Sequence, residues 1–405
     1  MDSSRNKTDN NHGAGKQHYM FDYLENIYAY CPASVIDFST GKQISQEQLS
    51  KTLTPSLAEL ELSDHKRYCI PQPVRDIYAR YRPTPLFKAA KFERAIGTDC
   101  QIYIKDEGHT PTGNHKANSA FLIAYLCKCD GVHTIVTETT GNWGLALAMA
   151  SKEFGLTTIC FMDTESDRIR PDRKALMEQI GAKVIIVEQN EEHHDLLSLS
   201  ADAAIKFTRD MPNAVYIFGS VYNYFITPQT IIGIEAKDQM GDKYPDIVVG
   251  SCGGGANLLG TAATFIVDIL ETGHPVEIFC AESEHCPILS RGKMGMYSVD
   301  NQGYYPLIKT YGLDGIGTSE YIGGLGSTIV ASPVAYLHSQ GLIGAKAYRA
   351  QDAQRASKLF YEAEGKAVAL ETGYQLAAVI EKARQNTGKI ILVNISSQGF
   401  NSSYA

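Results

Sequence analysis

The sequence lacks the long apolar segments and the excess of positive charge that mark several classes of protein. No run of 18 or more apolar residues occurs, so no membrane-spanning helix is predicted. The formal net charge of −8 argues against nucleic acid or an anionic membrane surface as partner. Residues 1–17 are polar and contain no apolar core segment, which excludes an ordinary secretory signal. We therefore expect a soluble, cytoplasmic protein.

Cysteine is also sparse, and its spacing is typical of neither disulfides nor zinc sites. The nine cysteines are an odd number in a chain of 405 residues. Cys127 and Cys129 lie two positions apart, but no second Cys or His pair follows at the spacing of zinc ligands. This pattern predicts free thiols in a reducing compartment and no metal site.

The composition and length indicate two globular domains. Hydrophobic residues make up 44% of the chain and charged residues 20%, and 405 residues exceed the usual size of one domain. We expect an N-terminal extension over residues 1–66, disordered over 1–17 because that stretch is polar and turn-rich. Residues 67–225 and 226–405 are the two predicted α/β domains.

From residue 82 onward, predicted strands alternate with predicted helices. Apolar runs predict strands at 101–105, 134–137, 158–162, 183–187, 247–250, 276–281 and 389–395. Helical patterns fill the intervals at 116–127, 144–153, 174–180 and from 257. Such alternation is typical of open, twisted parallel sheets covered by helices on both faces. Ligands of such sheets bind at the carboxyl ends of the strands, and four motifs fall there.

The first motif places a lysine where a helix begins. A strand ends at Lys105, a turn with proline and glycine follows, and His115-Lys116 opens the helix. The positive end of the helix dipole lowers the pKa of a lysine at this place, which suits an amine that forms a Schiff base. The amides of the same turn can hold a phosphate. The alternative is a solvated lysine in a turn.

The second motif is a glycine loop, with Gly253, Gly254 and Gly255 followed by Ala256 and Asn257. Without side chains, its backbone amides can close on an anion, and the asparagine can add a donor. The alternative is a tight turn, for which three glycines are more than is needed. The loop is not GxGxxG and no GKS or GKT follows, so dinucleotide and P-loop interpretations are weak.

The third motif, Glu138 to Gly144, again joins a strand to a helix. Its hydroxyls, amides and helix N-terminus suit a substrate carboxylate. Glu138, at the strand end, can act as an acid, a base or a charge stabiliser. The alternative is an ordinary helix N-cap with a solvated Glu138.

The fourth motif is Ser396, at the end of the last predicted strand. A serine hydroxyl that hydrogen-bonds a heteroaromatic nitrogen leaves that nitrogen largely unprotonated. In a pyridine cofactor this favours β-elimination and β-replacement over transamination. The alternative is a polar strand terminus.

These motifs follow the chain order of the fold-type-II pyridoxal-phosphate enzymes. The sequence resembles the tryptophan synthase β chain family, and within it the stand-alone second branch, from about residue 70 to residue 399. Further matching segments are Arg82–Leu86, Gly219–Val221, Gln229–Gly233, Cys286–Gly292 and Ala369–Glu371. The resemblance implies two open, twisted sheet domains with pyridoxal 5′-phosphate (PLP) in the cleft between them. It also implies a homodimer.

The resemblance assigns roles to residues of the motifs. Lys116 would hold PLP as a Schiff base and carry the proton of the substrate α-carbon, and Glu138 would help the leaving group depart. The residues implied to bind the cofactor are His115, Lys116, Gly253, Gly254, Gly255, Ala256, Asn257, Glu371 and Ser396. Those implied to bind the substrate carboxylate are Thr139, Thr140, Gly141, Asn142 and Trp143.

The chain also departs from the family pattern. Family members typically read Glu-Thr-Gly-Ala-Gly-Gln where the segment from Glu138 is one residue shorter, and its Thr-Gly-Asn core resembles the loops of threonine synthases and ammonia-lyases. Ala256 replaces the usual serine, and Gly326 stands where the stand-alone branch carries arginine after Gly-Gly-Leu. The cofactor residues are thus nearly intact, whereas the substrate residues have changed.

The leading expectation is a PLP-dependent carbon–oxygen lyase that works on serine or a related amino acid through an aminoacrylate on Lys116. It would catalyse β-elimination or β-replacement with a small nucleophile, like the tryptophan synthase β chain. The alternatives are a non-indole nucleophile in specialised amino-acid biosynthesis, a serine/threonine dehydratase, and a threonine-synthase-like reaction. A non-catalytic PLP-binding homologue is a further alternative.

Overall fold

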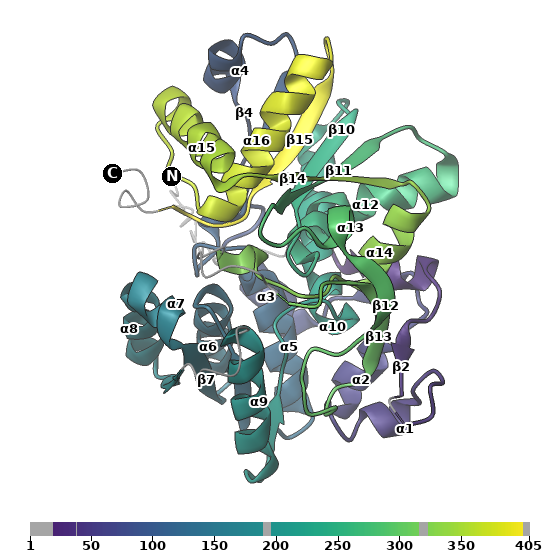
Figure 1. The fold of residues 1–405 in the computed structure, drawn as a ribbon, viewed down its shortest axis with the longest axis vertical. Helices are drawn as coiled ribbons and strands as arrows, with labels where there is room; N and C mark the ends of the chain where they lie inside the picture. Colours follow the sequence, from purple (N-terminus) through teal and green to yellow (C-terminus); the bar gives the residue numbers. More distant parts are fainter. Residues whose placement is uncertain (1–18, 38, 189–195, 316–322, 400–405) are drawn as a thin grey trace, which may run out of the picture.

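The computed structural model describes residues 19–37, 39–188, 196–315 and 323–399, so the predicted disorder of residues 1–17 lies outside it. Two parallel sheets, each covered by helices on both faces, lie one above the other along the long axis (Figure 1). This confirms the predicted α/β class with open, twisted sheets.

The larger sheet has six strands in the order β14-β11-β10-β15-β5-β4. Their bounds are β4 Leu86–Lys88, β5 Gln101–Asp106, β10 Ile247–Ser251, β11 Glu277–Ser283, β14 Ile343–Tyr348 and β15 Ile390–Ile395. All neighbours are parallel except β4, which runs antiparallel to β5. The central strand β10 is buried along its whole length, as expected for a parallel strand covered on both faces.

The smaller sheet has four parallel strands in the order β8-β7-β6-β9. Their bounds are β6 Thr134–Glu138, β7 Thr157–Asp163, β8 Lys183–Val187 and β9 Ala214–Tyr216. Every strand predicted from the sequence is present, with bounds that agree to within one residue for most of them. The agreement reflects continuous apolar runs that are bounded by turn residues.

The helices cover both sheets. The bounds of those that flank the sheets are α4 Ala90–Ile96, α5 Ala117–Cys129, α6 Asn142–Glu153, α7 Thr164–Ile169, α8 Pro171–Ile180, α9 Leu196–Arg209, α11 Ile231–Met240, α12 Ala256–Thr272, α15 Ala350–Glu364 and α16 Leu370–Gln385. Shorter helices are α1 Gln46–Leu49, α2 Pro55–Glu61, α3 Gln72–Tyr78, α10 Asn223–Ile226, α13 Ile288–Arg291 and α14 Ser332–Ser339. Single 3₁₀ turns are η1 Ile27–Tyr30, η2 Glu107–His109, η3 Thr227–Thr230 and η4 Gly323–Leu325.

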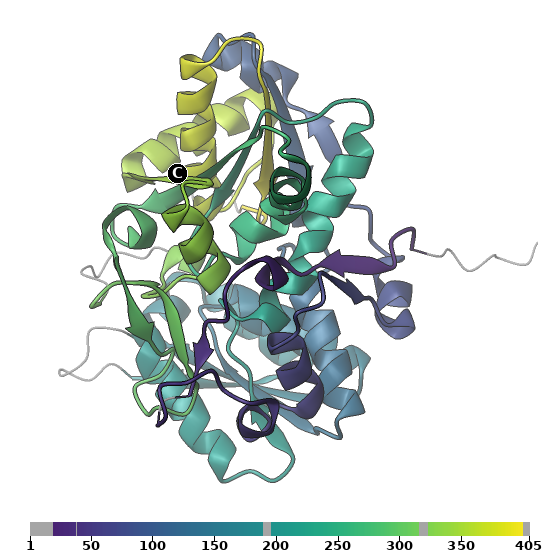
Figure 2. The same cartoon turned by 90° about the vertical axis from the view of Figure 1, so that its right-hand side faces the viewer.

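The described part of the N-terminal extension lies across the body of the molecule (purple in Figure 2). Its strands are β1 Tyr23–Glu25 and β2 Val35–Ile36; β1 pairs with β3 Arg67–Cys69, and β2 joins β12 Lys293–Tyr297 and β13 Leu307–Gly312 in a three-stranded sheet. The Tyr28 hydroxyl donates a hydrogen bond to the carbonyl oxygen of Val221. Pairing with β13 therefore ties the extension to the C-terminal part of the chain.

The sheets do not follow the chain order in which two domains were predicted. β4 and β5 precede residue 226, yet they pair in the larger sheet with strands from the C-terminal half, because β15 returns beside β5. A boundary near residue 226 stays a prediction, and strands before it contribute to both sheets. Among the described residues, no helix is both long and apolar enough to cross a membrane.

Candidate active site

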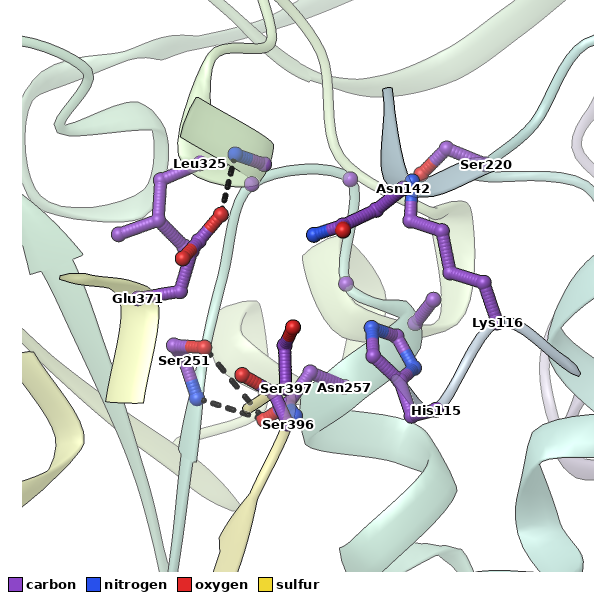
Figure 3. A pocket seen from close by; sticks show the side chains of 15 residues that line it. His115, Lys116, Asn142, Ser220, Ser251, Asn257, Leu325, Glu371, Ser396 and Ser397 are labelled. Carbon is purple, nitrogen blue, oxygen red and sulfur yellow. Dashed lines mark hydrogen bonds between the residues drawn. The ribbon is translucent and has the colours of Figure 1, made fainter. Parts of the chain in front are cut away.

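Loops at the carboxyl ends of β5, β10 and β15 meet around one pocket (Figure 3). All nine residues predicted to bind the cofactor line it: His115, Lys116, Gly253, Gly254, Gly255, Ala256, Asn257, Glu371 and Ser396. Of the predicted substrate loop, Asn142 lines it.

Lys116 stands immediately before α5, and its amine points into the pocket (Figure 3). Its backbone N–H donates to Oδ1 of Asn114 at 3.0 Å, whereas Nζ forms no hydrogen bond or ion pair with any residue that the structure describes. Burial lowers the pKa of the amine, and the carboxylates of Glu138 and Glu371 offset part of this effect. A larger fraction of the amine is therefore neutral, as a nucleophilic lysine requires.

A buried network of ion pairs fixes the start of α5. Asn118, in its first turn, donates to Oε2 of Glu107 at 2.8 Å, and Arg82 bridges Glu107 and Glu235 at 3.1 and 2.7 Å. Lys105 adds a second cation, 2.7 Å from Glu235. Burial raises the pKa of Glu107, but Arg82 and Lys105 outweigh it and bring that pKa to about 2. Two buried cations balance two buried carboxylates, so removing any one would leave an uncompensated charge.

The glycine loop between β10 and α12 leaves no space for side chains. A Cβ atom on Gly253 would lie 2.7 Å from the carbonyl oxygen of Gly324, and one on Gly254 would lie 1.8 Å from Oγ of Ser220. Gly255 has a φ of +97°, which side chains disfavour. Bare backbone amides at a helix start form a concave site for an anion, so these residues fit a phosphate group.

The side chain of Asn257 lines the pocket and is also held in place by hydrogen bonds to its neighbours. Its Oδ1 accepts from the backbone N–H of Ser251 and from Nε2 of Gln375, both at 3.1 Å. Its Nδ2 donates to Oδ1 of Asn394 at 2.7 Å. One Nδ2 proton therefore remains for a ligand.

The opposite wall carries Glu371 and Ser396. Glu371 lies in the first turn of α16, and its Oε1 accepts from the backbone N–H of Gly324 at 2.7 Å. The backbone N–H of Ser396 donates to Oγ1 of Thr372 at 3.2 Å, and the two hydroxyl oxygens are 3.1 Å apart. The Ser396 side chain is thereby placed at the pocket by α16.

The predicted substrate loop divides between the pocket and the core. Asn142 points into the pocket (Figure 3), and its buried Oδ1 has no hydrogen-bond partner in the part of the chain that the structure describes. Oγ1 of Thr139 accepts from the N–H groups of Gly141 and Gly144, both at 2.9 Å, as an N-cap does. The Trp143 side chain is 3% exposed, and its Nε1 donates to Oγ1 of Thr137 at 2.8 Å. These contacts turn the Trp143 ring into the core.

Glu138 lies behind this loop at the end of β6. It is 4% exposed, and the Tyr216 hydroxyl donates to its Oε2 at 2.5 Å. The alternative of a solvated Glu138 is therefore wrong. Burial raises the pKa of Glu138 to about 7, although the bond from Tyr216 and the charge of Lys116 act against this rise. The carboxyl is not among the groups that line the pocket, but its charge acts on Lys116.

Sequence reasoning did not assign roles to several residues that shape the pocket. Ser220, Ser251, Gly324, Leu325 and Ser397 also line it. Ser220 and Gly324 lie in or beside segments that match the family pattern, and that match could have identified them as pocket residues. Tyr216 left no such signal, because it acts through Glu138, which is 78 positions away in the sequence.

Comparisons with known proteins agree with this geometry. The family model described as "Pyridoxal-phosphate dependent enzyme" matches residues 77–397. The chain is 36% identical to the tryptophan synthase beta chain of Pseudothermotoga lettingae over 402 residues, covering 93% of this chain and 95% of the relative. It is also 36% identical to the tryptophan synthase beta chain 2 of Thermotoga maritima, covering 90% and 91%.

Solved structures show a related fold at lower identity. A fungal L-serine ammonia-lyase from Rhizomucor miehei matches with a TM-score of 0.63 and 17% identity, covering 79% of this chain and 95% of that one. A pyridoxal 5′-phosphate-dependent aspartate racemase matches with a TM-score of 0.60 and 21% identity, covering 82% and 98%. At these identities the likeness concerns the fold.

Proposed function

The chain belongs to the pyridoxal-phosphate dependent enzymes, among the relatives of the tryptophan synthase β chain, and we propose that it eliminates or replaces the β-substituent of serine or a related amino acid. It is a PLP-dependent lyase. The observation that carries the proposal is the amine of Lys116, which forms no hydrogen bond or ion pair with a described residue and faces a glycine loop too crowded for any side chain.

The residues around the pocket fit the cofactor. Lys116 would hold its aldehyde carbon, the amides of Gly253 to Gly255 would hold its phosphate together with His115, and the Ser396 hydroxyl would face its ring nitrogen. When bound, PLP supplies an electron sink for negative charge at the substrate α-carbon. A hydroxyl beside the ring nitrogen moderates that sink and favours loss of a β-substituent over transamination.

The Lys116 amine is the base of the proposed reaction. Burial lowers its pKa, so that the free amine would be able to accept the α-proton of a bound substrate. Its position at the start of α5 is fixed by the buried network around Glu107. Lys116 would later return that proton or pass it on.

Glu138 is the proposed acid at the β-carbon. With a pKa of about 7, it is present as both acid and carboxylate at neutral pH. The acid form can protonate a departing hydroxyl, and the carboxylate can orient an incoming nucleophile. The hydrogen bond from Tyr216 holds the carboxyl while it changes charge.

The substrate carboxylate would bind at the start of α6. Asn142 presents its side chain to the pocket there, and the helix N-terminus favours a negative charge. Thr139, Thr140, Gly141 and Trp143 would contribute by shaping the loop and through its backbone amides. A homodimer, predicted from the resemblance, remains part of the proposal, and light scattering of the purified protein tests it.

A deaminating dehydratase is the second candidate. It is favoured by the short loop, in which Asn142 is the side chain that reaches the pocket. Such an enzyme would let water, rather than a second substrate, complete the reaction. Release of ammonia and a keto acid from serine or threonine distinguishes it.

The test is a spectrum followed by product analysis. The protein purified with PLP should absorb near ~410–420 nm, as expected for a cofactor joined to a lysine amine. Addition of L-serine, O-phospho-L-serine or L-threonine should then change the band. Tryptophan formed with indole supports replacement, whereas ammonia and keto acid without any nucleophile support the second candidate. Absence of the band from folded protein contradicts both.

A further inference from the structure

His115 is connected to two uncharged buried side chains that fix the place of its ring proton. Its Nδ1 lies 2.8 Å from Oε1 of Gln229. Nε2 of Gln229 donates to Oγ of Ser119, which in turn donates to the carbonyl oxygen of Phe225 at 2.6 Å. Gln229 and Ser119 are both fully buried.

The donor and acceptor roles along this series of hydrogen bonds follow from its last acceptor, the carbonyl oxygen of Phe225. A carbonyl oxygen can only accept, so Ser119 must give its single proton to Phe225. Ser119 can then only accept from Gln229, which requires the amide nitrogen on that side. The amide oxygen therefore faces His115, and Nδ1 must carry a proton.

A neutral His115 consequently presents an unprotonated Nε2. The ring lies beside the glycine loop at the pocket (Figure 3), and Nε2 forms no hydrogen bond with any residue that the structure describes. Burial and the charge of Lys116 keep the pKa of His115 low, at about 4, although Gln229 and Glu107 act in the opposite direction. The neighbouring η3 and the first turns of α12 contain no charged side chain.

A phosphate dianion and an unprotonated Nε2 repel each other, because both are acceptors. We propose that Gln229 and Ser119 hold His115 as the Nδ1–H tautomer, and that binding of the cofactor phosphate draws one proton from solvent to the contact between Nε2 and a phosphate oxygen. Gln229 is thus a positioning residue that makes cofactor binding proton-linked. The inference rests on the proposed function, since it requires the pocket to take a phosphate.

The proton balance depends on pH. The second pKa of a phosphate ester is about 6, so at pH 8 a dianion meets a neutral imidazole and the shared proton must come from the solution. At pH 5.5 most of the ester is a monoanion and brings the proton itself. Uptake should therefore be close to one proton at pH 8 and fall below about one half at pH 5.5.

The test is calorimetry of the full-length chain freed of PLP, with benzyl phosphate as ligand. This compound has no aldehyde that Lys116 could capture and no ring nitrogen whose own protonation could change on binding. Titrations in buffers of different ionisation enthalpy count the protons taken up. In Gln229→Glu the new carboxylate should protonate His115 before the ligand arrives, and uptake at pH 8 should fall by at least half. The control is Gln340→Glu, which adds the same charge at the exposed residue that follows α14, away from the pocket, and should leave the uptake unchanged.

Nitrogen-15 NMR of the histidine rings provides a measurement that needs no Gln229 variant. The spectrum should show His115, assigned with His115→Asn, as a neutral Nδ1–H tautomer that becomes doubly protonated or hydrogen-bonded when the ligand binds. A wild-type Nε2–H tautomer, no ligand binding, or uptake near zero at pH 8 would overturn the inference. Zero uptake in a protein that still shows the PLP–lysine band leaves the proposed function intact. If His115 is the Nδ1–H tautomer but the protein shows no PLP–lysine band, the proposed function is contradicted instead.

Discussion

The wall of the pocket that the glycine loop forms differs in construction from the wall that the loop after β6 forms. On the first, Asn257 is held by Ser251 of β10, Asn394 of β15 and Gln375 of α16. On the second, Asn142 has a buried oxygen with no partner among the described residues, and its neighbours are occupied in capping α6 or packing in the core. We call them the cofactor wall and the substrate wall.

The difference indicates which wall is complete without a ligand. The crowded backbone and the hydrogen bonds that hold Asn257 specify one geometry, so the cofactor wall is preorganised for one group, although the buried Oε1 of Gln375 has no hydrogen-bond partner among the described residues. The buried Oδ1 of Asn142 costs free energy until a donor such as an amine N–H arrives, whereas a carboxylate would accept from Nδ2 of the same amide. The substrate wall is therefore incomplete without its ligand. Changes in the first should therefore abolish cofactor retention, and changes in the second should alter substrate use.

The largest effect is expected for Lys116→Ala. Without the amine, neither the covalent hold on PLP nor the proposed base remains, and turnover should fall by about 10⁴-fold or more. The visible band of the purified protein should vanish, as absorbance spectroscopy can show. The control is Lys128→Ala, on the last turn of α5. Lys105→Ala is unsuitable as a control because it breaks the buried network. A band that persists in Lys116→Ala would place the linkage on another lysine.

Glu138→Gln should have the next largest effect and should spare the cofactor wall. Loss of the proposed acid should lower kcat by about 10²–10³-fold, while the PLP band stays. Because the pKa of Glu138 is about 7, the elimination rate of the wild type should decrease as pH rises through 7. Steady-state rates between pH 5.5 and 8.5 measure this limb, which should be absent from the variant. An unchanged pH profile would remove Glu138 from the chemistry.

The same raised pKa predicts a dependence of stability on pH. Between the ordinary glutamate pKa of 4.5 and about 7, the folded chain holds a proton that the unfolded chain releases. Stability from this group is therefore complete below the lower value and is lost as pH rises through 7, by about 3 kcal/mol in total. Melting temperatures should accordingly fall less between pH 5 and pH 8 in Glu138→Gln than in the wild type. An equal fall in both proteins would contradict the assigned shift.

Gly254→Ala tests the crowding of the cofactor wall directly. The new Cβ would lie 1.8 Å from Oγ and 2.9 Å from Cβ of Ser220, so the loop must move and PLP affinity should fall by about 10–100-fold. Equilibrium titration of PLP absorbance measures this. In the double variant Gly254→Ala/Ser220→Gly both Ser220 atoms are gone and the contact with Cγ1 of Val221, at 3.0 Å, remains, so part of the affinity should return. Failure of this rescue would mean that Gly254 acts by some other means than space.

All nine residues predicted to bind the cofactor line the pocket, because most of them lie in loops after strands whose apolar runs are easy to recognise and because their motifs match the family pattern. Glu371, in the first turn of α16, was predicted from the resemblance alone. The contacts between distant residues could not be predicted. Glu138 and Tyr216 are 78 positions apart, and nothing local to either indicates the other. Strand β14 was also missed, since its small and polar residues at the sheet edge do not resemble a buried strand.

The substrate wall shows a second limit of sequence reasoning. Five consecutive residues of the motif were given one role, yet neighbours on the first turn of a helix point in different directions. The structure sends Asn142 to the pocket and the ring of Trp143 to the core. A motif therefore identifies a loop more reliably than it identifies the side chains that act in it.

Asn142→Ala should accordingly change substrate use more than cofactor binding. It removes a side chain that faces the pocket, and the loss of one hydrogen bond to a charged group should raise KM by about 10-fold. The PLP band and its affinity should be unchanged. Steady-state kinetics with each amino acid that reacts gives KM and kcat separately. A fall in PLP affinity of the size expected for Gly254→Ala would mean that the two walls are not independent.

Trp143→Phe should have the smallest effect on catalysis, although it alters the residue next to Asn142. The indole packs against Gly219 and lies 5.0 Å from the ring of Phe225, centroid to centroid, so the substitution leaves a small cavity and removes the bond to Thr137. Stability should fall by about 2 kcal/mol, whereas KM should change less than threefold. Trp143 is the single tryptophan, so unfolding must be followed by circular dichroism rather than by tryptophan fluorescence. A large rise in KM without loss of stability would show that the indole reaches the substrate and that the substrate wall extends beyond Asn142.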